Sequence, residues 1–368
     1  MALSVGIVGL PNVGKSTLFN ALSSAKAEAA NYPFCTIEPN VGVVTVPDKR
    51  IDALDTIVHA DRIVPTTINF VDIAGLVRGA SKGEGLGNQF LSHIREVDAI
   101  VQVARCFEDA NVVHVENRVD PVSDIQTVTV ELCLKDLDTV QRRADRGRKA
   151  AKSGDAKEKL AVEIAEGLVA HLDSGKPARS YKLPDHADAP NVLRDMQLLT
   201  AKPTFYIANV DEASLSALDK NPHYLALKAL ADSEGAPVVP VCAALEEQIA
   251  QLEPADRPDF LQSAGLEEPG LHTVIRAGYK LLDLNTFFTA GKTEVRAWTF
   301  PKGARAPQCA GVIHTDFERG FIKAEVIWWE DFVKLGGESK CRDAGKLGIE
   351  GKEYVMRDGD VVHFRFNV

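Results

Sequence analysis

The sequence has 368 residues, of which 45% are hydrophobic and 26% are charged, and its formal net charge is −10. This length is sufficient for roughly two or three globular domains with buried cores. The acidic balance argues against a protein that coats nucleic acid through its overall field, although a local basic patch is compatible with it. No apolar run approaches the length of about 18 residues that a membrane span needs, and the amino-terminal residues lack the features of a signal peptide. The six cysteines lie far apart without zinc-site spacing, so we expect a cytoplasmic protein with reduced thiols and no membrane partner.

Short apolar strands alternate with helical stretches in the first 120 residues. Strands are expected at 5–8, 68–71 and 99–103, and two more follow at 204–208 and 237–241. Parallel strands that are buried on both faces are apolar in this way, and strand–helix alternation is typical of a doubly wound sheet. The sequence therefore predicts an α/β fold with a mostly parallel sheet.

A helical pattern without proline extends from about Ser123 to Gly175. Two apolar stripes at helical spacing are expected there, one at Val130, Leu134, Leu137, Gln141 and Ala144 and the other at Leu160, Ile164, Leu168 and Leu172. Between them, residues 153–155 predict a turn followed by a helix cap. We predict a helical hairpin, an antiparallel coiled coil, inserted at 123–200 into a domain that spans 1–282.

The last region, from about Asp283, is rich in β-strand patterns. Strands are expected at 294–300 and 360–366, with a turn at 357–359 before the last one. We predict a small, separate β-rich domain at 283–368.

Residues 9–16, GLPNVGKS, match the P-loop pattern G-x-x-x-x-G-K-[ST] and follow a strand, as the motif requires. In this motif backbone N–H groups wrap the α- and β-phosphates, Lys15 places its charge on the β/γ oxygens, and Ser16 ligates Mg²⁺. A Rossmann dinucleotide site is disfavoured because the glycines do not fit G-x-G-x-x-G. The sequence therefore predicts a P-loop NTPase whose nucleotide-binding residues include Gly9, Asn12, Val13, Gly14, Lys15, Ser16 and Thr17.

Further phosphate and metal ligands are expected at fixed places after the P-loop. Asp72 ends the strand at 68–71 and would hold Mg²⁺ through water, with a turn or helix-cap role as the alternative. Gly75 would offer its N–H to the γ-phosphate, and Thr36 is a candidate second Mg²⁺ ligand on a switch segment. The glycine-rich segment 75–87 is predicted to be switch II, although a passive flexible loop has the same composition.

Two departures from an ordinary GTPase concern water and base recognition. The residue after D-x-x-G is Leu76 instead of the glutamine that orients the attacking water. The base-reading loop is NVDE at 209–212 instead of N-K-x-D, so Val210 removes the lysine stem and Glu212 is one methylene too long for guanine. Guanine selectivity should be degraded, since a polar site is selective only when its partners align. A GTPase with a relaxed motif is the alternative.

The stretch DIAGLVRGAS at 72–81, followed by GEGLGN at 83–88, resembles the Obg-related GTPases. With NVDE at 209–212 and NYPF at 31–34, the resemblance narrows to the YchF subfamily of Obg-like ATPases and covers essentially the whole chain. It implies a G-domain-like P-loop NTPase with a helical insertion and a C-terminal TGS domain of β-grasp type. It also implies that ATP is hydrolysed in preference to GTP without a glutamine, through a base site at Asn209, Val210 and Glu212.

The resemblance also implies roles for individual residues. It supports Ser16 and Thr36 as Mg²⁺ ligands, and it places Asn12 where related proteins coordinate an activating K⁺. The catalytic set that it implies is His114, Lys15 and Asn12, although the residues alone leave a structural role for His114 open. Ala244 stands where GTPases have the lysine of S-A-K, which leaves base packing there undecided.

Basic residues gather near the hairpin turn of this acidic chain: Arg142, Arg143, Arg146, Arg148, Lys149 and Lys152. Phosphate oxygens are a natural counter-charge, but a solvated helix face balanced by carboxylates is equally compatible. The resemblance favours RNA and the ribosome, in particular its large subunit, contacted through the hairpin and the TGS domain. We therefore expect a nucleotide-dependent ATPase switch on the ribosome. An Obg-type GTPase in ribosome assembly and a nucleotide-binding scaffold with negligible turnover are the alternatives.

Overall fold

A computed structural model describes residues 3–24, 40–73, 86–116, 118–151 and 155–367. Contacts divide the chain into two compact units. The first contains most of residues 69–278 together with the amino terminus, and the second joins residues 43–68 to residues 279–368. Thus a segment between the first strands packs with the carboxyl-terminal region, which the domain ranges expected from the sequence did not include. No helix among the described residues has the length and apolar character needed to cross a bilayer.

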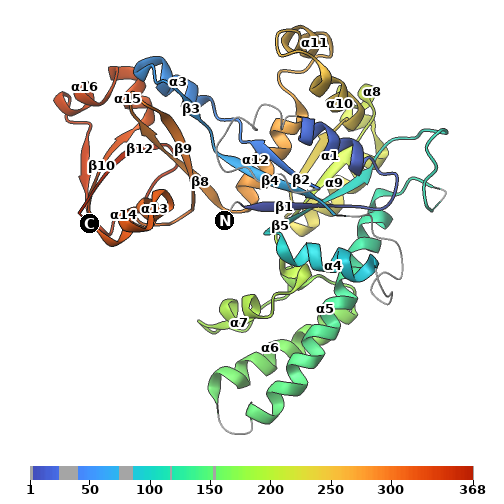
Figure 1. Cartoon of the computed structure of the whole chain (residues 1–368). Helices are drawn as coiled ribbons and strands as arrows, with labels where there is room; N and C mark the ends of the chain where they lie inside the picture. Colours follow the sequence, from blue (N-terminus) through green and yellow to red (C-terminus); the bar gives the residue numbers. More distant parts are fainter. Residues whose placement is uncertain (1–2, 25–39, 74–85, 117, 152–154, 368) are drawn as a thin grey trace. The chain divides into compact units, whose positions relative to one another are not determined.

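One sheet, most of whose residues belong to the first unit, has the order β2-β4-β1-β5-β6-β7 (Figure 1). Its strands are β1 (Ser4–Val8), β2 (Val41–Thr45), β4 (Thr67–Asp72), β5 (Ala99–Arg105), β6 (Thr204–Asn209) and β7 (Val238–Val241). β1 pairs in parallel with both β4 and β5, and the pairs β5–β6 and β6–β7 are also parallel. The five strands expected from apolar runs and the α/β class are confirmed. Because these strands are parallel, the chain leaves their carboxyl ends at one edge of the sheet, where ligands bind in such folds.

The helices of this unit are mostly connections between its strands. They are α1 (Lys15–Ser24), α4 (Leu86–Glu96), α5 (Pro121–Ala151), α6 (Ala156–Asp173), α7 (Ala189–Asp195), α8 (Glu212–Leu215), α9 (Pro222–Glu234), α10 (Ala243–Gln251), α11 (Arg257–Ser263) and α12 (Gly270–Leu281). Three short 3₁₀ turns complete the set: η1 (Ala178–Ser180), η2 (Leu199–Ala201) and η3 (Leu218–Lys220).

The predicted helical hairpin is confirmed as α5 and α6, which lie side by side (Figure 1). Asp155 caps α6, since its carboxylate accepts from the backbone N–H groups of Lys157 and Glu158. All four residues of the predicted second stripe are buried. The predicted first stripe is partly wrong, because Val130 and Leu134 are exposed and Cys133 and Val140 pack against α6 instead.

A buried carboxylate anchors the hairpin to the start of β6. Asp136 of α5 accepts from the backbone N–H groups of Leu199 and Thr200, both at 2.8 Å, and from the Thr200 hydroxyl at 2.6 Å. Its side chain thereby satisfies the first N–H groups of η2, which the turn itself leaves without partners. Burial raises the pKa of Asp136, and these hydrogen bonds oppose the rise.

The second unit has its own sheet, in the order β11-β10-β12-β8-β9-β3. Its strands are β3 (Ile63–Val64), β8 (Leu284–Ala290), β9 (Val295–Pro301), β10 (Phe321–Trp328), β11 (Gly348–Glu350) and β12 (Asp360–Phe366), and its helices are α3 (Lys49–Val58), α13 (Ala306–Ile313), α14 (Thr315–Arg319), α15 (Trp329–Leu335) and α16 (Glu338–Asp343). Successive residues of β12 enter different cores, because side chains alternate across a strand. Val362 and Phe364 pack with α13, whereas Val361 packs with α3 and α15. The expected β-rich region is confirmed as a sheet of its own.

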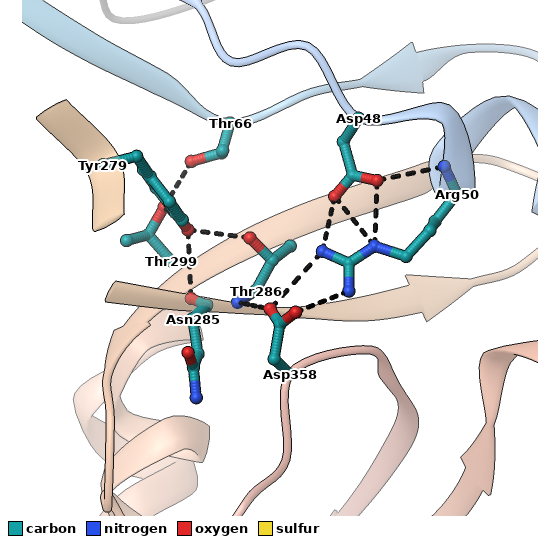
Figure 2. A network of polar contacts seen from close by, with 8 residues as sticks. All are labelled: Asp48, Arg50, Thr66, Tyr279, Asn285, Thr286, Thr299 and Asp358. Carbon is teal, nitrogen blue, oxygen red and sulfur yellow. Dashed lines mark hydrogen bonds and ion pairs between the residues drawn. The ribbon is translucent and has the colours of Figure 1, made fainter. Parts of the chain in front are cut away.

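A polar network explains why residues 43–68 belong to this unit (Figure 2). Arg50 donates to Asp48 at 2.7 Å and to Asp358 at 2.8 Å, and Asp358 in turn accepts from the backbone N–H of Thr286 at 2.7 Å. The Tyr279 hydroxyl lies 2.7 Å from that of Thr286. One guanidinium therefore joins carboxylates that are 310 residues apart in the chain.

The described cysteines are Cys106, Cys133, Cys242, Cys309 and Cys341; all are free and buried, in agreement with the expected reduced thiols. Burial raises the pKa of Cys106 and of Cys133 to about 12. Cys35 lies outside the described residues.

Candidate nucleotide-binding site

The P-loop connects the end of β1 to the start of α1, and its backbone explains its residue types. Asn12 and Gly14 have positive φ angles of 62° and 94°, which asparagine and glycine adopt most readily. A Cβ atom on Gly9 would lie 2.7 Å from the carbonyl oxygen of Val103 on β5, so only glycine fits there. Val13 is fully buried and holds the loop against the core.

Two predicted phosphate and metal ligands are brought together by the pairing of β1 with β4. The Lys15 ammonium and the Asp72 carboxylate form an ion pair of 2.7 Å. Ser16 is exposed and lines the adjacent cavity. Hydroxyl and carboxylate oxygens are the hard donors that Mg²⁺ prefers, so the chemistry of Ser16 and Asp72 fits the metal. Thr36 and Gly75 lie outside the described residues.

Asn209, at the end of β6, connects two loops through one buried side chain. Its Nδ2 donates to the carbonyl oxygen of Val13 at 2.9 Å, and its Oδ1 accepts from the backbone N–H of Ala243 at 3.0 Å. Ala243 begins α10, whose N-cap residue Cys242 makes no side-chain capping bond. The amide of Asn209 therefore caps α10 and positions the P-loop at the same time.

A cavity of about 1020 Å³ opens between these loops. Polar and apolar residues from four segments line it: Leu10, Pro11, Asn12, Gly14, Lys15, Ser16, Thr17, Phe107, Glu108, Asp109, Ala110, Val112, Asn209, Val210, Asp211, Glu212, Cys242, Ala243, Ala244, Leu245 and Gln248. This volume is at the upper end of the range of small-molecule sites, roughly 300–1,000 Å³. The structure thus brings the predicted P-loop and base-site residues around one cavity.

The base-reading end of this cavity differs from a guanine site. Val210 is buried, and its backbone N–H bonds to the carbonyl of Val241 at 2.9 Å. The Asp211 carboxylate caps α8 by accepting from the backbone N–H of Ser214 at 2.8 Å. Glu212, the first residue of α8, is exposed and lines the cavity. The side chain at the guanine-reading position is therefore the longer carboxylate, and the neighbouring aspartate is already engaged.

The wall formed by residues 107–112 was not predicted. Arg105, 1% exposed at the end of β5, holds this loop by donating to the carbonyl oxygens of Phe107 at 3.0 Å and Val112 at 2.8 Å. It also donates to the carbonyl oxygen of Asp109 at 3.1 Å. A buried arginine whose hydrogen bonds go to backbone oxygens leaves no sequence motif. The cavity wall itself could have been predicted, because the loop at 107–112 directly follows a parallel strand.

His114 is buried next to the cavity wall without lining the cavity. Its Nδ1 accepts from the backbone N–H of Glu116 at 3.2 Å, so Nε2 carries the proton and donates to Asp124 at 3.0 Å. Burial raises the pKa of Asp124, and the hydrogen bond from His114 opposes that rise. Asn12 Nδ2 donates to the carbonyl of Val113 at 3.1 Å, which ties the P-loop to the peptide before this histidine.

The predicted basic cluster of the hairpin divides into two groups. Arg143 pairs with Glu158 through two bonds of 2.9 and 3.0 Å, and Arg148 pairs with Asp145 and Glu166. Arg142, Arg146 and Lys149 form no ion pair with any residue that the structure describes, and Lys152 lies outside that part of the chain. Basic residues with carboxylate partners and basic residues without an ion pair to a described residue thus lie on the same helix.

Comparison with known proteins agrees with this geometry. Residues 4–135 match a family model described as a 50S ribosome-binding GTPase, and residues 284–367 match the C-terminal YchF-GTPase model, described as a protein of unknown function. Relatives named ribosome-binding ATPase YchF from Haemophilus ducreyi, Escherichia coli O157:H7 and Bacillus subtilis are 57%, 55% and 52% identical over 368 residues, which is 100% of both chains in each case.

A solved structure, that of the YchF GTPase of Schizosaccharomyces pombe, superimposes with a TM-score of 0.88 at 38% identity. The match covers 99% of this chain and 97% of that chain. Since the motifs, the fold and the full-length identity agree, the chain belongs to the YchF family of P-loop NTPases.

Proposed function

We propose that this chain is a Mg²⁺-dependent ATP hydrolase that acts as a nucleotide-dependent switch on the ribosome. The observation that carries the hydrolase proposal is one cavity at the carboxyl ends of β1, β5, β6 and β7, which gathers Lys15, Asn209 and the P-loop. The relatives named ribosome-binding ATPase support ATP as the nucleotide and the ribosome as the partner. A cytoplasmic location and contact with the large ribosomal subunit, whose 50S name appears in the matching family model, are part of the proposal.

Each residue of the P-loop has a definite task in this proposal. Lys15 neutralises the β/γ oxygens, and the backbone N–H groups from Asn12 to Thr17 wrap the phosphates. Ser16 and Asp72 would hold Mg²⁺, with Thr36 as a further ligand. The bound metal would neutralise charge on the β- and γ-phosphates. Because Asp72 forms a direct ion pair of 2.7 Å with Lys15, this pair would open when Lys15 turns to the phosphates and Asp72 to the metal.

In this proposal, the preference for adenine follows from the absence of guanine-reading groups at the base-binding end of the cavity. Guanine readout needs a short carboxylate that accepts from N1–H and N2–H₂ together. Glu212 carries an extra methylene, and the carboxylate of Asp211 already accepts from Ser214. The opposite side, Cys242 to Ala244, offers no lysine. Guanine would therefore lose its bidentate partner, whereas adenine needs none.

Hydrolysis without a glutamine requires another group to position water. We propose that K⁺ bound beside Asn12 compensates for charge and that His114 takes part in catalysis. The Asn12 Oδ1 accepts from no residue within the described ranges, so it is available to a cation. Both nitrogens of His114 are bonded, so its participation requires the loop at 111–116 to rearrange, and the Asn12–Val113 hydrogen bond links that rearrangement to the P-loop.

Competitive binding of ATP and GTP to nucleotide-free protein, with Mg²⁺ and K⁺ present, tests the substrate. We expect ATP to bind at least tenfold more tightly, a difference of about 1.4 kcal/mol. Glu212→Asp should shift this ratio toward GTP, because it restores the shorter carboxylate. Glu247→Asp makes the same chemical change on α10 outside the cavity lining and should leave the ratio unchanged. Tighter binding of GTP by the wild type would instead support an Obg-type GTPase.

A further inference from the structure

The wall of the nucleotide cavity carries one aromatic side chain, that of Phe107. It is the only aromatic ring among the described residues that line this cavity, and it is half-buried. The guanidinium of Arg105 lies over the ring, 4.7 Å from its centroid. A cation in this position is attracted by the negative face of the ring. The ring of Phe107 is therefore supported from behind by a buried arginine that does not itself line the cavity.

Arg105 also holds the backbone that carries this ring. Its Nε donates to the carbonyl oxygen of Phe107 itself, and its two terminal nitrogens donate to those of Asp109 and Val112. A guanidinium has five N–H donors in one plane, so a single side chain can bond three oxygens while lying flat against a ring. Because these carbonyls are spread from residue 107 to residue 112, Arg105 fixes the shape of the whole wall.

A buried amide connects this wall to the base-reading end of the cavity. Asn221 Nδ2 donates to the carbonyl oxygen of Cys106 at 2.8 Å and to the hydroxyl of Ser214 at 3.1 Å. Ser214 belongs to α8, the helix that Glu212 begins. Since β5 and β6 are neighbouring parallel strands, the wall and the base-reading loop also leave the sheet side by side. The ring of Phe107 is thus held next to the segment that reads the base.

The chemistry of the wall identifies the part of the nucleotide that it serves. Phosphates are bound by N–H groups and by the Lys15 ammonium at the P-loop. A phenyl ring offers nothing to a phosphate, whereas every base has a flat face that stacks on an aromatic ring. The wall at 107–112 is therefore suited to the nucleoside half of the ligand, and the P-loop to the phosphate half.

We propose that Arg105 is a positioning residue for nucleoside binding, which holds the wall at 107–112 so that Phe107 stacks on the base. The inference rests on the proposed function for the identity of the nucleotide. Lysine keeps the charge of Arg105, but its ammonium is a compact donor that cannot bond three spread carbonyls and cover a ring. Arg105→Lys should therefore weaken ligands that contain a base and spare those that contain phosphates alone. A general loss of folding would weaken both.

The test is titration of the full chain with ATP and, separately, with inorganic triphosphate, in the presence of Mg²⁺ and K⁺. Arg105→Lys should lower the affinity for ATP by roughly tenfold, which is within the usual range for one stacked base. Its affinity for triphosphate should stay nearly that of the wild type. Arg179→Lys is the matched control, because Arg179 is a half-buried arginine of the same unit that bonds Glu234 at 3.0 Å away from the cavity lining. It should leave both affinities unchanged.

Two further variants keep the test decisive. If Arg105→Lys does not fold, as judged by its melting curve, Arg105→Gln removes the buried charge and is measured in the same way. Phe107→Leu removes the ring while Arg105 stays in place, and it should show the same selective loss of ATP affinity. Combining Arg105→Lys with Phe107→Leu should cost little more than either change alone, since both act on one contact.

The outcomes separate this inference from the proposed function. Equal losses of ATP and triphosphate affinity in a folded Arg105 variant, unchanged ATP affinity, or additive effects of the two changes would overturn the role of Arg105. If the wild type prefers GTP or hydrolyses neither nucleotide, the proposed function fails. The selective loss, measured with the nucleotide that binds more tightly, then still decides the role of Arg105. A wild type that binds triphosphate but no nucleotide would refute both.

Discussion

Replacing Asn209 tests whether one buried amide holds the nucleotide site together. Asn209→Ala removes both of its hydrogen bonds, to the carbonyl of Val13 and from the N–H of Ala243. Asn209→Asp has nearly the same shape and keeps the bond from Ala243. However, it places a carboxylate oxygen where the amide Nδ2 now lies, 2.9 Å from the Val13 carbonyl oxygen. The two variants therefore separate loss of an attraction from introduction of a repulsion.

The expected loss of stability is large because Asn209 is buried, with 4% of its surface exposed. Two net hydrogen bonds contribute roughly 0.5–1.5 kcal/mol each, and a buried group left without a partner costs about 1–3 kcal/mol. We expect Asn209→Ala to lower the free energy of unfolding by about 2–4 kcal/mol. ATP affinity should fall by on the order of 10- to 100-fold, because the P-loop loses its anchor.

Isothermal titration with ATP and denaturant unfolding measure the two quantities. At neutral pH Asn209→Asp should bind ATP no better than Asn209→Ala, since the carboxylate repels the Val13 carbonyl. As the pH falls, protonation gives Asn209→Asp an O–H that can donate to that carbonyl again, so its affinity relative to Asn209→Ala should rise. Wild-type ATP affinity in both variants, or no pH dependence of their ratio, would refute the reasoning.

Two further predictions concern the hairpin and its junction with the site. His114→Ala should reduce ATP turnover to background and leave ATP affinity nearly unchanged, as measured by steady-state hydrolysis beside direct titration; undiminished turnover would remove His114 from the mechanism. Asp136→Ala should lower the unfolding free energy by roughly 3–5 kcal/mol, because it leaves the buried N–H groups of Leu199 and Thr200 without acceptors. Asp138→Ala, an exposed change on the same helix, should cost little in the same denaturant titration, and equal stability of the two variants would contradict the assigned anchor.

Local sequence patterns predicted those parts of the molecule whose causes are local. The strands of the first sheet are apolar runs, and the P-loop needs glycine and asparagine at positive φ angles within a few residues. The hairpin stripes show the limit of this reasoning. Leu137 and Ala144 belong to both the predicted and the observed face of α5, so helical spacing alone does not decide between Val130 and Cys133. The decision depends on where α6 lies, which is tertiary information.

Contacts between distant residues were the part that no local pattern indicated. The motif predicted Asn209 as a base-site residue, but its bonds to Val13 and Ala243 require three segments to converge. Arg105 was missed because its partners are backbone carbonyls, which every sequence supplies. Likewise, the pairing of Arg50 with Asp358 depends on packing across the whole second unit. Such residues can be recognised only after the fold is known.

The helix α5 extends from the surroundings of the nucleotide site to the turn of the hairpin. Near its first turn Asp124 bonds His114, whose neighbour Val113 bonds the P-loop residue Asn12. Arg142 lies 18 residues further along the same helix, a distance of about 27 Å at 1.5 Å per residue. A continuous helix transmits displacement with little loss, since bending it would break backbone hydrogen bonds. Asp136 fixes the middle of α5 to η2. A movement of the first turn of α5 would therefore tilt the helix about Asp136, and the last turns of α5 would move in the opposite direction. Nucleotide-driven movement near His114 would therefore shift Arg142 and Arg146 relative to Arg95, which lies on α4 and is held by Lys202.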